Sequence, residues 1–225
     1  MPAENKNFLL KTKNVFGIVA FTLILRFVFL FLLDLLPEEA YYWNYSQHLD
    51  IGYLDHPPMV AWLQWLSTSI FGDTEFGVRL PAFLCWFVAA WFIFKLTARL
   101  FDRTAGYQSI LLMAVLPIYF SIGFIMTPDA PLYAAWAGAL YFMARALVDG
   151  KRSAWYGIGL FIGLGMLSKY SIGLLGLSGF AFIIIDKDSR KWLLRPEPYL
   201  SIILALIIFS PVLIWNYQHD WASFR

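Results

Sequence analysis

Residues 15–33 of this chain read VFGIVAFTLILRFVFLFLL, an apolar stretch interrupted by the single charge of Arg26. A helix needs about 20 apolar residues to cross the roughly 30 Å hydrocarbon core of a bilayer. This stretch therefore predicts a membrane-spanning helix. Arg26 lies near its middle, and we expect it to face protein or a polar cavity, because a guanidinium exposed to lipid is costly.

Six further stretches have the same character, at residues 80–97, 107–125, 131–148, 154–168, 171–185 and 198–215. The chain is 60% hydrophobic and 14% charged. A soluble domain has about 45 to 50% apolar and about 25% charged residues. We therefore expect an all-α, polytopic helical bundle with about seven transmembrane helices, forming one membrane-embedded domain over residues 1–225. The short stretches 154–168 and 171–185 predict two Gly-rich helices joined at Ser168-Lys169-Tyr170.

Charge and cysteine usage argue against nucleic-acid binding, an intrachain disulfide and a cysteine-based metal site. The net charge of +2 comes from short basic clusters beside apolar stretches, which is not the extended patch that binds nucleic acid. Cys85 is the single cysteine and lies in an apolar stretch, so the chain has no intrachain disulfide and no CxxC metal site.

Basic residues predict the orientation, since cytoplasmic loops carry most Lys and Arg. The seven expected spans place 13 of the 17 basic residues on one side, namely Lys6, Lys11, Lys13, Lys95, Arg99, Arg103, Arg145, Lys151, Arg152, Lys187, Arg190, Lys191 and Arg195. We expect that side, and the N-terminus with it, to be cytoplasmic.

The opposite, outer side receives the ionisable groups best suited to chemistry: Glu38, Glu39, Asp55, His56, Asp129, Lys169, His219 and Asp220. Several belong to one long outer segment, residues 34–79. Carboxylates and a histidine beside apolar surface can be tuned as acids, bases or ligands. These residues therefore predict one site built from several outer loops.

Pro37-Glu38-Glu39 begins the outer segment. Proline followed by acids is typical of a helix start, and a catalytic carboxylate pair is the alternative interpretation. If a helix begins there, neighbouring side chains point about 100° apart, so one carboxylate is expected to be catalytic and the other structural. Tyr42 follows at helical spacing and suits either a sugar ring or the membrane interface.

Asp55-His56-Pro57-Pro58 offers a carboxylate and an imidazole in a chain stiffened by two prolines. Both side chains are plausible ligands for a divalent metal ion, but two ligands are too few to specify one. Contacts to a polar substrate and a simple turn are the alternatives.

Two further outer groups lie between spans. Asp129, in Thr127-Pro128-Asp129, is expected to cap the helix that follows. Lys169 lies between two apolar helices, where an ammonium needs an anion or water. A lipid phosphate is the natural anion there, and snorkelling to ordinary headgroups is the alternative.

Taken together, five motifs resemble the bacterial branch of the protein mannosyltransferase family, glycosyltransferase family 39, which is similar to the lipid A aminoarabinose transferases. They are Glu38-Glu39-Ala40-Tyr41-Tyr42-Trp43, Gly52-Tyr53-Leu54-Asp55-His56-Pro57-Pro58, Thr127-Pro128-Asp129, Leu167-Ser168-Lys169-Tyr170 and Trp215-Asn216-Tyr217-Gln218-His219. They occur in the family's order from about residue 15 to the end of the chain.

The resemblance implies a GT-C fold in the bacterial inner membrane and transfer of a sugar from a polyprenyl-phosphate donor, with inversion, at the periplasmic face. The implied acceptor is a hydroxyl of lipid A, another envelope glycan or a protein. Family members usually carry Asp then Glu at the acidic pair, which makes Glu38 the preferred catalytic residue and keeps Glu39 as a candidate. The implied substrate-binding residues are Tyr42, Asp55, His56, Asp129, Lys169 and His219.

The resemblance requires no nucleotide, and the chain contains neither a P-loop nor a GxGxxG motif. A divalent metal at Asp55 and His56 stays open as a cofactor. Family members continue through further spans, which makes this chain the N-terminal part of such an enzyme. The alternative function is a transporter or flippase of a phosphorylated lipid, although the chain shows no inverted repeat of the kind that transporters often carry.

Overall fold

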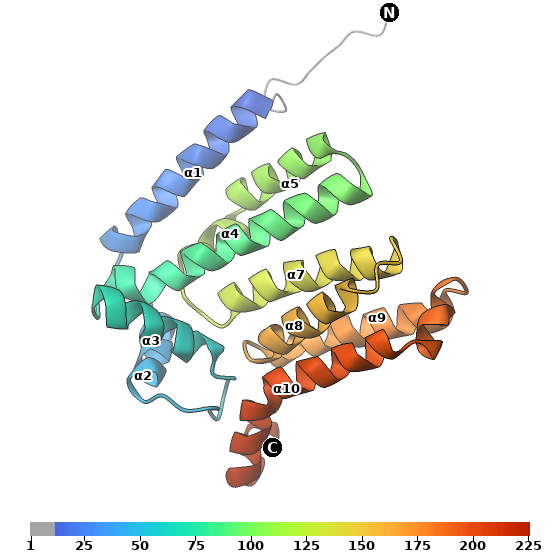
Figure 1. Ribbon diagram of the computed structural model, residues 1–225. Coiled ribbons are helices and arrows are strands. Elements are labelled where there is room, and N and C mark those ends of the chain that lie inside the picture. Colours follow the sequence, from blue (N-terminus) through green and yellow to red (C-terminus); the bar gives the residue numbers. More distant parts are fainter. Residues whose placement is uncertain (1–11) are drawn as a thin grey trace, which may run out of the picture.

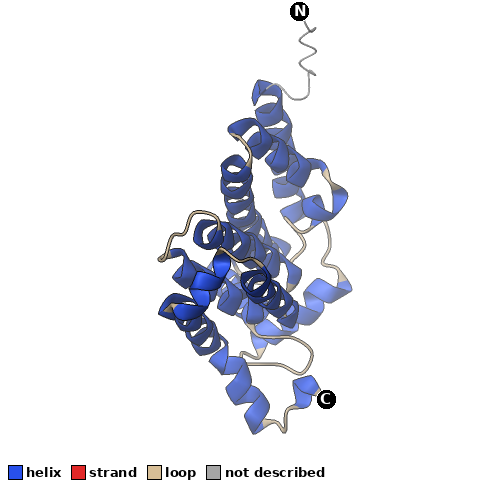
Figure 2. Ribbon diagram, turned by 90° about the vertical axis from the view of Figure 1, so that its right-hand side faces the viewer, coloured by secondary structure: helices blue, strands red, loops and turns tan. Residues whose placement is uncertain are grey.

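The computed structural model describes residues 12–225, and Figure 1 shows a bundle of helices. The α-helices are α1 (Thr12–Leu32), α2 (Pro37–Gln47), α3 (Met59–Phe71), α4 (Glu75–Leu100), α5 (Arg103–Val115), α6 (Pro117–Ser121), α7 (Asp129–Leu147), α8 (Ala154–Met166), α9 (Gly173–Ile185) and α10 (Pro196–Gln218). Short 3-10 helices are η2 (Tyr170–Ile172), η3 (Ser189–Leu194) and η4 (Ala222–Phe224). Figure 2 shows no strand in this range, so the all-α prediction is confirmed. Lys6 and Lys11 lie outside the described residues.

The long helices lie side by side, and α2 and α3 cross one end of the bundle, where α1 ends and α4 begins (Figure 1). Helix α7 packs between α4 and α8, and α8 packs between α7 and α10. The α8–α10 contact is close because α8 contributes glycines: a Cβ at Gly159 would lie 2.4 Å from the carbonyl oxygen of Ser201. This close packing is the role of the Gly-rich sequence in α8.

Within residues 12–225, three helices are long and apolar enough to cross a membrane: Lys13–Leu32, Glu75–Leu100 and Pro196–Gln218. Ala154–Met166 and Tyr170–Ile185 are shorter apolar helices, as the sequence predicted for this region. The junction between them is Ser168-Lys169, followed by the 3-10 turn of η2. The finer prediction of about seven transmembrane helices stays a prediction.

The continuous span expected at residues 107–125 is wrong, because the chain breaks into α5 and α6 at Leu116 and Pro117. Proline has no backbone N–H and pushes the preceding residue out of the helical region. Leu116 is accordingly extended, with φ −68° and ψ 127°. The break frees carbonyl groups at the end of α5, and these need donors in an apolar bundle.

Arg26 of α1 supplies those donors. Its Nη2 donates to the carbonyl oxygens of Met113 at 3.2 Å and Ala114 at 3.1 Å, and its Nε donates to that of Phe120 at 3.1 Å. The guanidinium also lies 4.3 Å from the ring centroid of Trp86. Arg26 therefore faces protein, as predicted, and it holds α5 and α6 in their broken geometry.

Ion pairs gather at the end of the bundle opposite α2 and α3. Arg99 pairs with Asp149, which also binds Arg145 at 2.9 Å, and Arg152 lies 3.6 Å from Glu197. These contacts connect the end of α4 with the end of α7, and the start of α8 with the start of α10. The prediction that these helix ends share one side agrees with this arrangement, and their cytoplasmic location stays a prediction.

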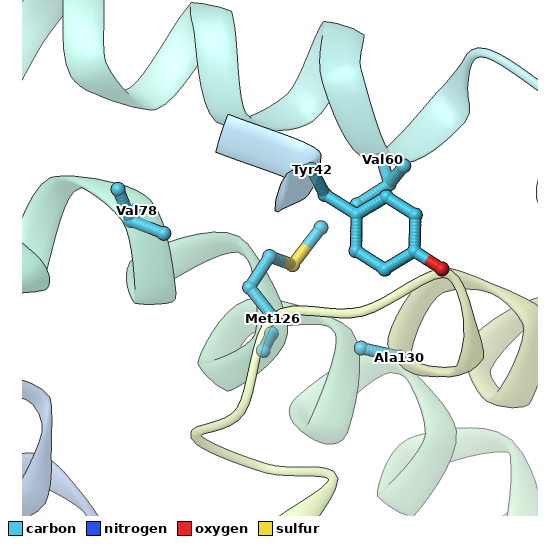
Figure 3. Packing of buried hydrophobic residues seen from close by; sticks show 6 residues of the cluster. Tyr42, Val60, Val78, Met126 and Ala130 are labelled. Carbon is cyan, nitrogen blue, oxygen red and sulfur yellow. The ribbon is translucent and has the colours of Figure 1, made fainter. Parts of the chain in front are cut away.

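A buried cluster supports the α2/α3 end of the bundle (Figure 3). Tyr42 of α2, Val60 of α3 and Val78 of α4 pack together with Met126 and Ala130, from the loop before α7 and its first turn. In Figure 3 the side chain of Met126 points toward the ring of Tyr42. This cluster fixes α2 against the loop that leads to Asp129.

Candidate active site

Helix α2 separates the two neighbouring glutamates. Pro37 is its first residue, Leu36 before it is extended, and Glu38 and Glu39 occupy the first turn, as the helix-start interpretation predicted. Glu38 is exposed, whereas Glu39 is 0% exposed. The two carboxylates therefore face different surroundings, as the rotation of about 100° per residue requires.

The carboxylate of Glu39 is enclosed by donors. Arg79 of α4 donates to it from Nη2, at 2.6 Å from Oε2, and from Nε, at 2.9 Å from Oε1. The backbone N–H of Leu36 donates to Oε2 at 3.0 Å, and that of Met126 donates to Oε1 at 3.0 Å. A carboxylate has about four acceptor positions, so these donors occupy them all.

Arg79 also binds the end of α1. Its Nη1 donates to the carbonyl oxygen of Leu33 at 2.5 Å, and its Nη2 donates to that of Asp34 at 2.8 Å. Sequence reasoning missed this residue, although a charge at the edge of the apolar stretch 80–97 was the available signal. A buried charge of this kind must be paired or neutralised.

Glu38 faces a cavity of about 460 Å3 at the α2/α3 end of the bundle. Its polar lining includes Glu38, Thr127 and Asp129. Apolar and aromatic residues form most of the remaining wall: Leu36, Ile118, Ile122, Ile125, Leu132, Tyr133 and Trp136. Since α6 and the loop after it supply one side of this wall, the break in the expected helix at 107–125 helps to build the cavity.

Asp129 and Lys169 form an ion pair, with Nζ 3.0 Å from Oδ1. Asp129 is the first residue of α7, and the N-cap position has no side-chain hydrogen bond. The expectation that Asp129 caps this helix is therefore wrong, because its carboxylate turns to Lys169 instead. The side chains are 48% and 39% exposed, and such a pair contributes about 0 to 1 kcal/mol. A stronger anion can displace Asp129 from the ammonium.

His56 lies among the same charges. Burial lowers its pKa and the Lys169 ammonium lowers it further, while Asp55, Asp129 and Glu38 act in the opposite direction. These charges come from residues far apart in the sequence, so the fold places Lys169, Asp129 and Glu38 within electrostatic range of His56. The structure thus brings together five of the predicted site residues.

Tyr42 connects His56 to the buried cluster. The Tyr42 ring is 5% exposed, and its hydroxyl lies 3.5 Å from Nδ1 of His56. Burial is the main cause that raises the pKa of Tyr42, to about 12, and the charge of Glu38 adds to it. Tyr42 is therefore a neutral hydroxyl at the edge of the site.

Asp55 is exposed and accepts a hydrogen bond from the Tyr41 hydroxyl. The Tyr41 and Tyr45 hydroxyls lie 2.5 Å apart, and the Tyr45 ring stacks on Tyr53 at 4.2 Å. Within residues 12–225, no group of three or more His, Cys, Asp or Glu side chains is arranged to hold a metal ion. A divalent metal ion at Asp55 and His56 therefore stays a prediction.

His219 lies at the end of α10, stacked on Trp215 with ring centroids 4.1 Å apart. Asp50 accepts a hydrogen bond from Trp215 Nε1 at 2.9 Å, and a Cβ on Gly52 would lie 2.6 Å from Trp215 Cγ. Trp215 thus anchors the loop before Asp55. Sequence reasoning included Trp215 in a motif but did not identify this docking role. No contact in the described structure joins His219 to the Glu38 cavity.

Comparison with known proteins identifies the family. The model of the family described as dolichyl-phosphate-mannose-protein mannosyltransferase matches residues 55–215, more than half of the chain. The chain belongs to this family. The match includes Asp55, His56, Asp129 and Lys169 but begins after Glu38, so the place of Glu38 in the site depends on its geometry.

Proteins with established names are similar along much of this chain. The lipid A galacturonosyltransferase RgtD of Rhizobium johnstonii is 28% identical over 206 residues, covering 85% of this chain and 40% of that protein. The undecaprenyl phosphate-alpha-4-amino-4-deoxy-L-arabinose arabinosyl transferase 1 of Proteus mirabilis is 25% identical over 155 residues, covering 67% of this chain and 28% of that protein. The chain thus spans well under half the length of these relatives.

The fold of this family member also matches a solved structure. The crystal structure of ArnT from Cupriavidus metallidurans in the apo state superposes with a TM-score of 0.76 at 22% identity. The match covers 93% of this chain and 43% of that one. The helical arrangement is therefore that of the matching part of the ArnT structure.

Proposed function

We propose that this chain carries the active site of a glycosyltransferase that moves a sugar from a polyprenyl-phosphate donor to a hydroxyl of lipid A or the lipopolysaccharide core. The observation that carries the proposal is that Glu38 and Asp129 line one cavity beside apolar helices, with the Lys169 ammonium paired to Asp129. The names of similar galacturonosyltransferases, which specify lipid A or the lipopolysaccharide core, favour these acceptors over a protein. The active site faces the periplasm, with the N-terminus in the cytoplasm.

Glu38 is the general base in this proposal. Its exposed carboxylate takes the proton of the acceptor hydroxyl while that oxygen forms a bond to the anomeric carbon from the face opposite the phosphate. The bond between the anomeric carbon and the phosphate oxygen breaks, and its electron pair leaves with the polyprenyl phosphate. One displacement inverts the anomeric configuration.

Lys169 stabilises the departing phosphate. In the structure its ammonium is held by Asp129 through a weak, half-exposed contact. A phosphate that gains negative charge as the bond breaks is the stronger partner, so this interaction acts on the transition state. Asp129, Asp55 and His56 then orient the two substrates, and Tyr42 supports His56.

Replacing Glu38 with Gln tests the proposal, with Glu75→Gln, in the first turn of α4 and outside the cavity lining, as the control. The protein is reconstituted in liposomes with a polyprenyl-phosphate sugar and lipid A, and transfer is followed by mass spectrometry. Loss of a general base costs about 100- to 10,000-fold in rate. We expect such a loss for Glu38→Gln and parental transfer for Glu75→Gln.

If Glu38→Gln transfers sugar at the parental rate, Glu38 is not the general base. If the parental protein moves labelled lipid between leaflets without releasing sugar, the protein is a transporter or flippase.

A further inference from the structure

We propose that the buried Glu39–Arg79 ion pair is a positioning unit that sets the separation between Glu38 and Asp129 across the cavity. This inference depends on the proposed function, in which these two carboxylates flank the reacting atoms. It gives Glu39 a positioning role in place of the catalytic one, since the acceptor positions of its carboxylate are occupied within the protein.

Glu39 contacts the backbone on both sides of the cavity. One carboxylate oxygen accepts the N–H of Leu36, which lines the cavity just before Glu38. The other accepts the N–H of Met126, which immediately precedes the lining residue Thr127. One rigid side chain therefore ties the start of α2 to the loop that carries Asp129.

The link from Met126 to Asp129 is short and constrained. Pro128 restricts the backbone between them, and the N–H of Ala130 donates to the carbonyl oxygen of Thr127 at 3.1 Å. The side chain of Met126 is fully buried against Tyr42 and Val78. A displacement of the Met126 backbone is therefore transmitted to Asp129.

Arg79 orients the Glu39 carboxylate and ties it to α1. Its guanidinium donates on one side to Glu39 and on the other to the carbonyl oxygens of Leu33 and Asp34. Five donors in a fixed plane make this bridge possible, whereas a lysine ammonium is a single point of contact. Arg79 cannot be replaced by lysine without losing part of the bridge.

Stability alone does not account for this pair. Side chains of Arg79 and Glu39 are 1% and 0% exposed, and replacing a buried ion pair with apolar residues is often neutral for stability. What such a replacement would lose is the set of directed hydrogen bonds to Leu36 and Met126. The pair therefore serves the geometry of the cavity.

The test uses the double variant Arg79→Met with Glu39→Gln, which removes both charges together and leaves neither ion unpaired. The glutamine side chain introduced by Glu39→Gln has one carbonyl oxygen, so it can accept from only one of the two backbone N–H groups in place of the carboxylate. A displacement of about 1 Å costs on the order of 100-fold in rate. We expect kcat to fall about 10- to 100-fold, with KM for the donor changed less than about threefold.

A matched control is Arg145→Met with Asp149→Asn, an ion pair at the opposite end of the bundle. We expect this control to change Tm without changing kcat. The single variant Arg79→Lys retains the charge and is expected to lose kcat as well. If the Glu39–Arg79 double variant lowers Tm but keeps the parental kcat, the pair is only structural and the proposal is overturned.

Combining the double variant with Glu38→Gln separates this inference from the proposed function. In the Glu38→Gln background the double variant is expected to cause little further loss, because the residue that it positions is already inactive. If the kcat losses of Glu38→Gln and of the double variant multiply in full when combined, the positioning role is overturned. If Glu38→Gln is inactive and the Glu39–Arg79 double variant is fully active, this inference alone is refuted. If Glu38→Gln is active, the proposed function is refuted.

Discussion

Replacing Lys169 with Met separates its two roles, as partner of Asp129 and as partner of the leaving phosphate. The contact with Asp129 is 3.0 Å long but half-exposed, so its loss is expected to cost at most about 1 kcal/mol of stability. A hydrogen bond from an ammonium to a charged phosphate contributes about 1.5 to 3 kcal/mol. At about 1.4 kcal/mol per factor of ten, its loss predicts a rate lower by about 10- to 150-fold.

The assay is the initial rate of sugar transfer in liposomes at saturating acceptor, together with Tm of the purified protein in detergent. Lys187→Met, beyond the end of α9, is the control for removing a lysine charge and is expected to keep the parental rate. A parental rate for Lys169→Met would refute the phosphate contact. A large drop in Tm that accompanies the loss of rate would show instead that Lys169 acts through folding.

Two further predictions concern the loop between α2 and α3. Burial lowers the pKa of His56, and the Lys169 ammonium contributes, so the unfolded chain binds this proton more readily than the folded one. The resulting stability is complete above the ordinary histidine pKa of about 6.5 and is lost as pH falls below it toward the lowered value. Between pH 7.5 and 5, Tm should therefore fall less in His56→Gln than in the parent. The control is His48→Gln, at an exposed histidine, which is expected to follow the parental Tm. Gly52→Ala places a Cβ 2.6 Å from Trp215 Cγ, and overpacking of this kind costs about 1 to 3 kcal/mol. An unchanged Tm for Gly52→Ala would contradict the docking of the loop on α10.

Apolar stretches in the sequence predicted most of the helices, because a chain in a bilayer must satisfy its backbone internally. The start of α2 at Pro37 and the two short helices around Lys169 were predicted for local reasons that the structure confirms. The break between α5 and α6 was not predicted, although Pro117 was its signal. A proline break in an apolar stretch is stable only where a donor is provided, and here that donor is Arg26, from another helix.

The site was predicted less completely than the helices. The rotation of about 100° per helical residue predicted that Glu38 and Glu39 face different sides. Which of them is buried depends on Arg79, 40 residues further along the chain. The cap expected of Asp129 was wrong, because local sequence at a helix start favours a cap, whereas the competing ammonium comes from the distant Lys169. Local spacing carries no information about such distant partners.

Composition and hydrophobic patterning by themselves determined the membrane class, the positions of most helices and the set of polar residues available for chemistry. These properties follow from the local cost of placing apolar and charged groups in water or lipid, which each short segment carries independently. Only the tertiary structure decided that Glu38 faces the cavity while Glu39 binds Arg79, and that Asp129 meets Lys169. Those outcomes depend on which donors the folded chain brings within about 3 Å of each carboxylate, and hydrogen bonds act only over such distances.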